Sequence, residues 1–245
     1  MSRFAPHPRP LEPPASPTRI PGRSPHQRSA VLRHSRSWAA HLEKACLAVV
    51  WGFGELMESS DRYTFGHCER VAAFAADIAG VLGLEQLQLT TVRVGAYLHD
   101  LGKVRVPREI LNKPGRLDPE ELETIRKHPV WGVELLAAVE LPWDIAPIIR
   151  WHHERFDGTG YPDGLRGAEI PLNAQIIGIA DAYDAITTTR SYRPAVSKRQ
   201  ALEEMRRNRR HWHPDVYTAF VQSFTHRRHA HASPRFDGMP GSGAA

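Results

Sequence analysis

Apolar residues recur at helical spacing along the middle of the chain. From His67 onward they fall three or four positions apart, at Val71, Phe74, Ala75, Ile78 and Leu82. This period places them on one stripe of an amphipathic helix, which we expect to end near Gly83. Such a stripe is typical of a helix that packs against a core.

Other segments carry the same period or the residues that mark helix ends. Leu87 to Leu101 predicts a helix stopped by Gly102, and Asp118 followed by Pro119 and two Glu residues is typical of a helix start. Further helices are expected at 38–59, 129–139, 143–153, 172–190, 197–208 and 214–225. Residues 154–171 contain four Gly and two Pro and predict one long loop. With no useful β alternation, the sequence predicts an all-α helical bundle.

The two ends of the chain differ in composition from its middle. Residues 1–36 are crowded with Pro, Arg and Ser, and residues 226–245 are rich in Gly, Ala and His. Proline at that density removes backbone donors and blocks helices. We therefore expect a disordered arm at 1–36, one folded domain at 37–225 and a disordered tail at 226–245.

The positive charge of the chain lies in these ends. Residues 1–36 hold seven Arg against one acidic residue, and 226–245 hold three Arg against one Asp, which together exceed the net charge of +5 of the whole chain. The part between them is therefore slightly acidic. That balance argues against a basic face on the folded part that would bind a nucleic-acid polymer. For the arm, we favour a solvated leader over a tether that binds an anionic partner.

Cysteines and apolar runs indicate neither a secreted nor a membrane protein. The two cysteines, Cys46 and Cys68, form no CxxC pair, so reduced thiols are expected. No apolar stretch is long enough to span a bilayer, and the N-terminus lacks the apolar core of a signal peptide. The sequence predicts a cytoplasmic location.

The strongest sign of chemistry is His99-Asp100, at the end of an apolar helix where a core would favour Leu or Val. A buried pair of this kind needs partners. Imidazole and carboxylate both bind divalent metals, and a carboxylate can bridge two ions. For an isolated His-Asp pair, a hydrogen-bonded core pair would be the favoured interpretation, so the remaining ligands decide the question.

Further His and Asp residues lie near predicted helix ends or in a buried helix. They are His67, His128, His152, His153 and Asp181. With the first pair they make seven ligands, which is too many for one tetrahedral structural site and suits two metals that share a carboxylate and a water. Ligand type alone allows Mn, Fe, Zn or Ni.

The motifs HDLGK, HHERFDGTGYPDG and IADAYDAITTTRSYRP occur in this order. With the segment between them they resemble the HD-GYP subgroup of the HD phosphohydrolase superfamily over about residues 61–220, and the resemblance makes 37–225 an HD-GYP catalytic domain. It assigns one metal to His67, His99, Asp100 and Asp181, with Asp100 bridging to a second metal held by His128, His152 and His153.

The resemblance also implies roles beyond the ligands. It places Lys103 at a substrate phosphate or at the attacking water, and Asp184, Arg190 and Arg193 among residues that recognise phosphate and order the site. Asp181, Asp184 and Thr188 are spaced to share one helix face. Some family members hold a third metal with a Glu four residues before the first His. This chain has Tyr63 there, so two metals, Fe or Mn, are expected.

The implied function is hydrolysis of cyclic di-GMP to pGpG, GMP or both, by water that the metals activate. Gly160 and Tyr161 of the GYP segment, Gly158 to Gly164, are expected to bind substrate, and a rigid loop that only covers the site fits equally well. A protein partner at this loop and a homodimer stay open. The alternatives are another cyclic dinucleotide as substrate, or a cyclic di-GMP-binding signalling module with weak turnover.

Overall fold

The computed structural model describes residues 41, 44–57, 66–189 and 195–227. Throughout these residues the regular elements are helices, and none is a strand. The predicted all-α fold is therefore confirmed. The whole expected arm at 1–36 and residues 228–245 of the expected tail lie outside the described residues, so disorder there stays a prediction, while residues 226 and 227 are helical.

The chain divides into two units, Met1–Ala45 and Cys46–Ala245. Of the first unit, only residues 41, 44 and 45 are described, and they are helical. The second unit contains all the candidate site residues. It begins with the remainder of a helix that runs to residue 57.

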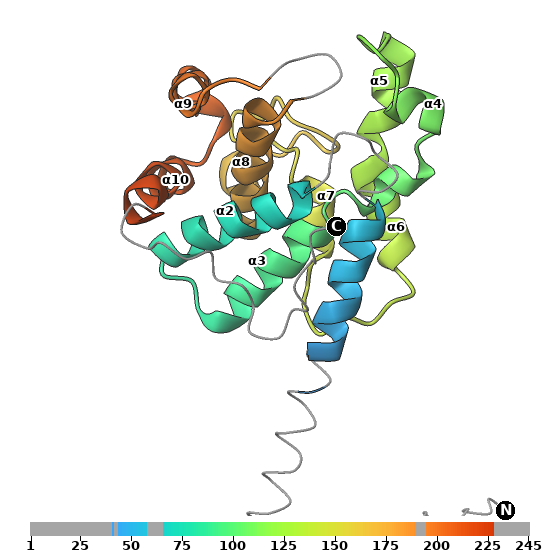
Figure 1. The fold of residues 1–245 in the computed structure, drawn as a ribbon, viewed down its shortest axis with the longest axis horizontal. Coiled ribbons are helices and arrows are strands. Elements are labelled where there is room, and N and C mark those ends of the chain that lie inside the picture. The colour runs from blue at the N-terminus through green and yellow to red at the C-terminus, as the bar shows by residue number, and fades with distance from the viewer. Residues whose placement is uncertain (1–40, 42–43, 58–65, 190–194, 228–245) are drawn as a thin grey trace, which may run out of the picture. The chain divides into compact units, whose positions relative to one another are not determined.

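The second unit continues with short and medium helices (Figure 1). The α-helices are α2 (His67–Val81), α3 (Gln86–Leu98), α4 (Arg108–Leu111), α5 (Pro119–Arg126), α6 (His128–Leu136), α7 (Ala146–Trp151), α8 (Leu172–Thr187), α9 (Lys198–Arg207) and α10 (Pro214–Arg227). Three 3₁₀ turns accompany them, η1 (Leu101–Arg105), η2 (Gly167–Glu169) and η3 (Arg209–His211). Among the described helices, none is long and apolar enough to cross a membrane.

The predicted signals at helix ends are present. Asp118 caps α5 by accepting a hydrogen bond from the Glu121 backbone, while the Glu121 side chain accepts from the Asp118 backbone, both at 2.9 Å. Gly83 follows α2 with φ of 72°, a value that glycine adopts at little cost. These local contacts explain why the sequence located both ends well.

Several predicted helices end earlier than expected, among them α3 and α8. α3 stops at Leu98, and Gly102 lies inside η1. α8 ends at Thr187, and Thr188 is extended with φ of −111° and ψ of 143°. The prediction that Thr188 shares a helix face with Asp181 and Asp184 is therefore wrong, because the helix does not reach it.

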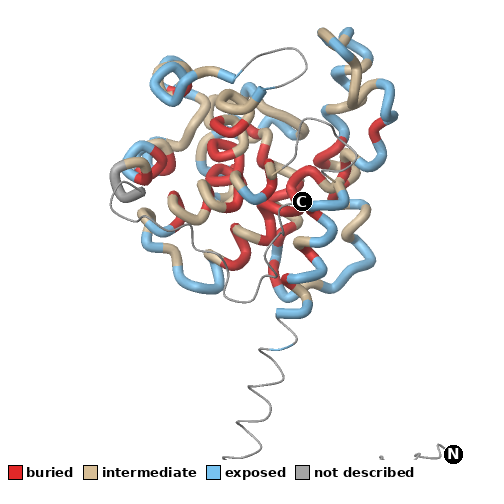
Figure 2. The backbone as a smooth tube through the Cα atoms, viewed as in Figure 1, coloured by how far each residue is buried: buried red, intermediate tan, exposed pale blue. Residues whose placement is uncertain are grey.

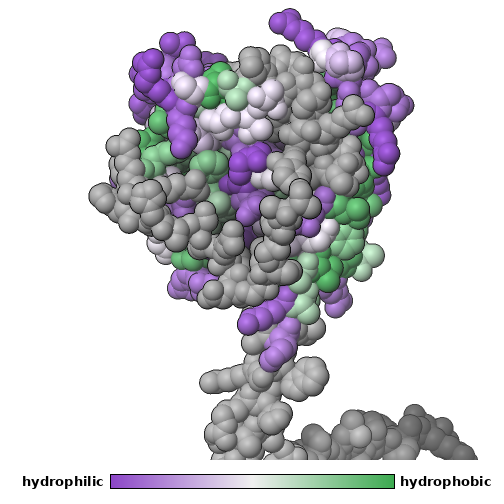
Figure 3. All heavy atoms as spheres, viewed as in Figure 1, coloured by the Kyte–Doolittle hydropathy of each residue, from purple (hydrophilic) through white to green (hydrophobic). Residues whose placement is uncertain are grey.

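The core lies where α2, α3, α7, α8 and α10 meet, and buried backbone concentrates along these elements (Figure 2). Ile176, Ile177 and Ile179 of α8 are fully buried. Tyr183 of α8 contacts Phe220 of α10 edge to face, with ring centroids 5.3 Å apart. Hydrophilic residues instead cover α5 and α9 at the upper edges of the space-filling view (Figure 3).

Two glycines let the segments that carry the candidate ligands approach closely. A Cβ at Gly178 of α8 would lie 2.5 Å from the carbonyl oxygen of His152. A Cβ at Gly102 of η1 would overlap the carbonyl oxygen of His128. Both obstacles are backbone atoms, which cannot rotate away, so these positions require glycine.

We expect Gly102→Ala to lower the free energy of unfolding by about 1–3 kcal/mol, because η1 and α6 must move apart. Gly80→Ala is the matched control. Gly80 is exposed in α2, and a Cβ there would have no atom within 4 Å, so alanine should be neutral or stabilise by about 0.5–1 kcal/mol. Thermal and urea denaturation measure both. Equal effects of the two substitutions would contradict the close approach at Gly102.

Candidate metal centre

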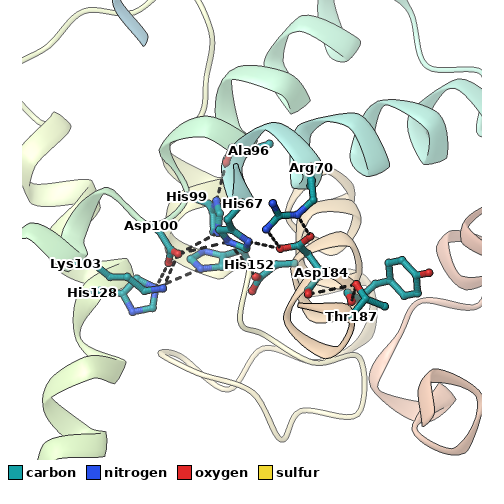
Figure 4. A network of polar contacts seen from close by, with 12 residues as sticks. His67, Arg70, Ala96, His99, Asp100, Lys103, His128, His152, Asp184 and Thr187 are labelled. Atoms are coloured by element: carbon teal, nitrogen blue, oxygen red, sulfur yellow. Dashed lines mark hydrogen bonds and ion pairs between the residues drawn. The ribbon is translucent and has the colours of Figure 1, made fainter. Parts of the chain in front are cut away.

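The seven candidate ligands come from helix ends and one helix interior. They are His67 at the start of α2, His99 and Asp100 after α3, His128 at the start of α6, His152 and His153 after α7, and Asp181 within α8. The structure brings them together in one cluster, part of which is drawn in Figure 4. The residues chosen from the sequence are thus neighbours in space.

The first half of the cluster surrounds one oxygen of Asp100. Asp100 Oδ2 lies 3.4 Å from His99 Nε2 and 3.9 Å from His67 Nε2. The same His67 nitrogen lies 3.4 Å from Asp181 Oδ1. Two imidazoles and two carboxylates therefore converge on one point.

The second half surrounds the other oxygen of the same carboxylate. Asp100 Oδ1 lies 3.2 Å from His128 Nε2, and the ligand atoms of Asp100, His128, His152 and His153 all lie within 4.8 Å of one another. Asp100 thus faces both halves, one oxygen to each. A ligand that bridges two metals needs this arrangement.

Three of the imidazoles share one anchoring contact, in which Nδ1–H donates to the carbonyl oxygen three residues earlier. The pairs are His99 with Ala96 at 2.7 Å, His128 with Ile125 at 2.8 Å and His152 with Ile149 at 2.9 Å. A carbonyl oxygen only accepts, so Nδ1 carries the proton in each ring. In the neutral imidazole Nε2 is then left with a lone pair directed into the cluster.

Several contacts in the cluster join two acceptors. His128 Nε2 lies 3.3 Å from His152 Nε2 and 3.2 Å from Asp100 Oδ1. Such pairs repel each other unless a cation lies between them. Asp100 Oδ1 and the Nε2 atoms of His67 and His99 are also buried without a hydrogen-bond partner among the described residues. Imidazole nitrogens and carboxylate oxygens that offer lone pairs in this way fit divalent transition metals.

Electrostatics favours the protonation states that metal binding requires at His152, His153 and Asp100, but not at His99. Burial, reinforced by the neighbouring imidazoles, holds the pKa of His152 and His153 well below the ordinary value. Burial opposes ionisation of Asp100, but Lys103 and His99 outweigh it and hold its pKa well below the usual range. For His99, Asp100 outweighs burial and raises the pKa, so a metal bound there would displace a proton.

Lys103 is the positively charged neighbour of the Asp100 carboxylate. Its Nζ donates a hydrogen bond to Asp100 Oδ2 at 2.6 Å, and its side chain is 24% exposed. The ammonium group is therefore close to the cluster and accessible from solvent. This position is compatible with the expected contact to a phosphate.

Asp184 lies behind His67, with its side chain 1% exposed. Its Oδ2 accepts from His67 Nδ1 at 2.7 Å, and both carboxylate oxygens accept from Arg70. Burial opposes ionisation, but these hydrogen bonds lower the pKa of Asp184. No contact here supports the expected phosphate-recognition role, whereas site ordering fits the position.

The GYP segment folds back on His153, the candidate ligand that precedes it. The Tyr161 ring stacks on His153 with centroids 4.7 Å apart, and the Arg126 guanidinium lies 5.5 Å from the Tyr161 centroid. Burial and then the Asp100 charge raise the pKa of the Tyr161 phenol. A Cβ at Gly160 would lie 2.6 Å from the His153 carbonyl oxygen, so this glycine allows contact with the protein's own backbone.

Two acidic residues that the sequence analysis did not select hold this segment in place. Glu154, which is buried, accepts hydrogen bonds at Oε1 from the backbone of Asp163 at 2.7 Å and of Gly164 at 2.9 Å. Asp163 accepts two hydrogen bonds from Arg150, at 2.7 and 2.8 Å, and one from Trp151. The only sequence signal for Glu154 was its position directly after the His pair.

Three residues named from the sequence cannot be placed. Tyr63, Arg190 and Arg193 lie outside the residues that the structure describes. The expectations that Tyr63 excludes a third metal and that the two arginines bind phosphate therefore stay predictions.

The chain is similar to known proteins over most of its length. It is 36% identical over 184 residues to 3'3'-cGAMP-specific phosphodiesterase 2 of Vibrio cholerae, which covers 74% of this chain and 35% of the relative. It is 36% identical over 170 residues to a cyclic di-GMP phosphodiesterase of Thermotoga maritima, covering 68% of this chain and 46% of the relative. The chain thus spans less than half the length of these relatives.

Structural similarity and a family profile agree with these matches. An HDG"Y"P protein from Bdellovibrio bacteriovorus superposes with a TM-score of 0.55 at 25% identity, covering 65% of this chain and 51% of that one. The profile of the HD domain family matches residues 53–216, which is more than half of the chain. The chain therefore belongs to the HD domain family and, within it, to the HD-GYP type.

Proposed function

We propose that this protein is a metal-dependent phosphodiesterase that hydrolyses cyclic di-GMP to pGpG, GMP or both. The observation that carries the proposal is Asp100, whose two oxygens face two separate groups of buried imidazole nitrogens. The similarity to phosphodiesterases of cyclic dinucleotides supports the choice of substrate class.

The proposed cofactor is a pair of divalent transition metals, with Fe or Mn favoured over Zn or Ni. His67, His99 and Asp181 would hold the first, His128, His152 and His153 the second, and Asp100 both. When bound, two such cations lower the pKa of a water and orient a phosphate for in-line attack. The neutral imidazoles and ionised carboxylates described above suit this role.

The chain's own residues supply the remaining elements of the reaction. The Lys103 ammonium, 2.6 Å from Asp100 Oδ2, would offset the negative charge that develops on the phosphate oxygens. The bond from the water oxygen to phosphorus would form as the bond from phosphorus to the leaving 3'-oxygen breaks. The water would release its proton to solvent, and the 3'-oxygen would take up a proton to leave as a hydroxyl group. Asp100 and Asp181 would hold the metals that bind this water.

The GYP segment is proposed to shape the substrate side of the site. Tyr161 already stacks on His153 and lies beside Arg126, so a base that stacked on this ring would compete with Arg126. Gly160 packs on the protein's own backbone, which makes its effect on substrate indirect. These contacts favour a covering loop whose Tyr161 stabilises His153.

A second candidate substrate is 3'3'-cGAMP. Among the relatives, cyclic di-GMP and 3'3'-cGAMP phosphodiesterases match this chain equally well, at 36% identity in the two compared above. Both substrates contain the same bridged phosphodiester and differ in one base. The metal centre acts on the shared part, so discrimination must come from contacts to the bases.

We expect the purified protein to bind about two equivalents of Mn²⁺ or Fe²⁺ per chain, because its ligands form two groups. Asp100→Ala should abolish this stoichiometry and lower kcat by more than about a hundredfold, since both groups lose their shared ligand. Asp144→Ala, at an exposed position, is the matched control. Metal analysis and turnover assays measure both effects. Full activity after complete metal removal would rule out the mechanism.

We expect Lys103→Gln to lower kcat by about 10²–10³-fold while the protein still binds metal, because one charge that stabilises the transition state is lost. Substrate titrations with both proteins separate kcat from KM. An unchanged kcat would remove Lys103 from the reaction.

If cyclic di-GMP is the substrate, we expect its kcat/KM to exceed that for 3'3'-cGAMP by at least about tenfold, because groups that hydrogen-bond the second guanine would be left unpaired against adenine. Chromatography of the products after incubation with Mn²⁺ or Fe²⁺ measures both rates and identifies pGpG or GMP. Faster cleavage of 3'3'-cGAMP would favour the second candidate. Tight binding of cyclic di-GMP without cleavage would instead indicate a signalling module.

A further inference from the structure

Helices α2 and α8 face each other with two pairs of polar residues. His67 and Arg70 lie three positions apart on α2, and Asp181 and Asp184 lie three apart on α8, so each pair shares a helix face. His67 uses both ring nitrogens across this contact. Its Nε2 lies 3.4 Å from Asp181 Oδ1, and its Nδ1 lies 2.7 Å from Asp184 Oδ2.

Arg70 approaches Asp184 from the solvent side. Arg70 Nε donates to Asp184 Oδ1 at 2.6 Å, and Arg70 Nη2 donates to Oδ2 at 3.1 Å. The Arg70 side chain is 38% exposed, whereas that of Asp184 is 1% exposed. The guanidinium fork thus fixes the plane of a buried carboxylate and compensates its charge. Figure 4 shows this chain of contacts from Arg70 through Asp184 to His67.

His67 differs from the other anchored imidazoles in what holds its Nδ1. His99, His128 and His152 each follow a helical turn whose carbonyl oxygen lies three residues back. His67 is the first residue of α2, so this helix offers it no preceding turn. Asp184, 117 residues away in sequence, takes the place of that carbonyl oxygen.

We propose that Asp184 and Arg70 are positioning residues for His67. Asp184 accepts the Nδ1 proton, and Arg70 orients Asp184, so that Nε2 keeps its lone pair directed at the metal cluster. The proposal rests on the proposed function only in taking His67 as a metal ligand. It places two side chains, rather than backbone, in control of one ligand's tautomer and orientation.

The test compares Asp184→Ala, Arg70→Gln and Arg70→Lys with the original protein. The control is Arg206→Gln, which breaks an exposed ion pair between Arg206 and Glu203 on α9. Each metal-free variant is examined by thermal denaturation and by ¹⁵N NMR of the histidine rings, which distinguishes protonation at Nδ1 from protonation at Nε2. Titration calorimetry with Mn²⁺ then gives the affinity of each folded variant.

We expect Asp184→Ala to weaken Mn²⁺ binding by about 10–100-fold and to shift His67 away from the single Nδ1–H form. Arg70→Gln should have the same effects to a smaller degree. Arg70→Lys should retain more of the Mn²⁺ affinity than Arg70→Gln, because lysine keeps the positive charge but lacks the two-pronged guanidinium. The control should leave affinity and ring signals unchanged.

The outcomes separate positioning from a purely structural contact between α2 and α8. Lower thermal stability with unchanged Mn²⁺ affinity and unchanged His67 tautomer would overturn the proposal. If Asp184→Ala does not fold, the two Arg70 variants decide the question by the same measurements. The ring signals need neither metal nor substrate, so failure to hydrolyse cyclic di-GMP would refute the proposed function without deciding this one.

Discussion

The repulsion between buried acceptors is the constraint on which the rest of this structure depends. Once backbone carbonyls fix the proton of His128 and His152 on Nδ1, the two Nε2 atoms face each other at 3.3 Å, and one of them faces Asp100 at 3.2 Å. A core would not tolerate such contacts without compensation. Positive charge at the centre of the cluster removes the conflict, and the same charge is what a phosphodiester in that place would require.

The fold places these acceptors by ending helices next to one another. Glycine at 102 lets η1 pack against the start of α6, and glycine at 178 lets α8 pack against the end of α7, in both cases backbone against backbone. The isoleucines of α8 and the aromatic residues that α8 shares with α2 and α10 support these segments from the core. Close packing matters here because a small shift of a helix end would change which imidazole nitrogens and carboxylate oxygens face one another.

The sequence located the residues of this cluster because His and Asp at the ends of apolar helices stand out against their surroundings. It also located helix ends that depend on local contacts, as at Asp118. It could not orient Asp184, since the helical spacing places that residue on a face without saying what packs there. The partner, His67, is 117 residues away. Glu154 was missed for a related reason, because its hydrogen bonds go to backbone that the loop presents only once folded.

The attachment of the GYP segment has a mechanical consequence. Glu154 and Asp163 hold the segment to the end of α7, while Tyr161 stacks on His153 and Gly160 presses on the adjoining backbone. The segment and His153 are thus tied together by direct contacts. A molecule that bound the outside of this loop would therefore also act on the position of His153, without having to enter the site.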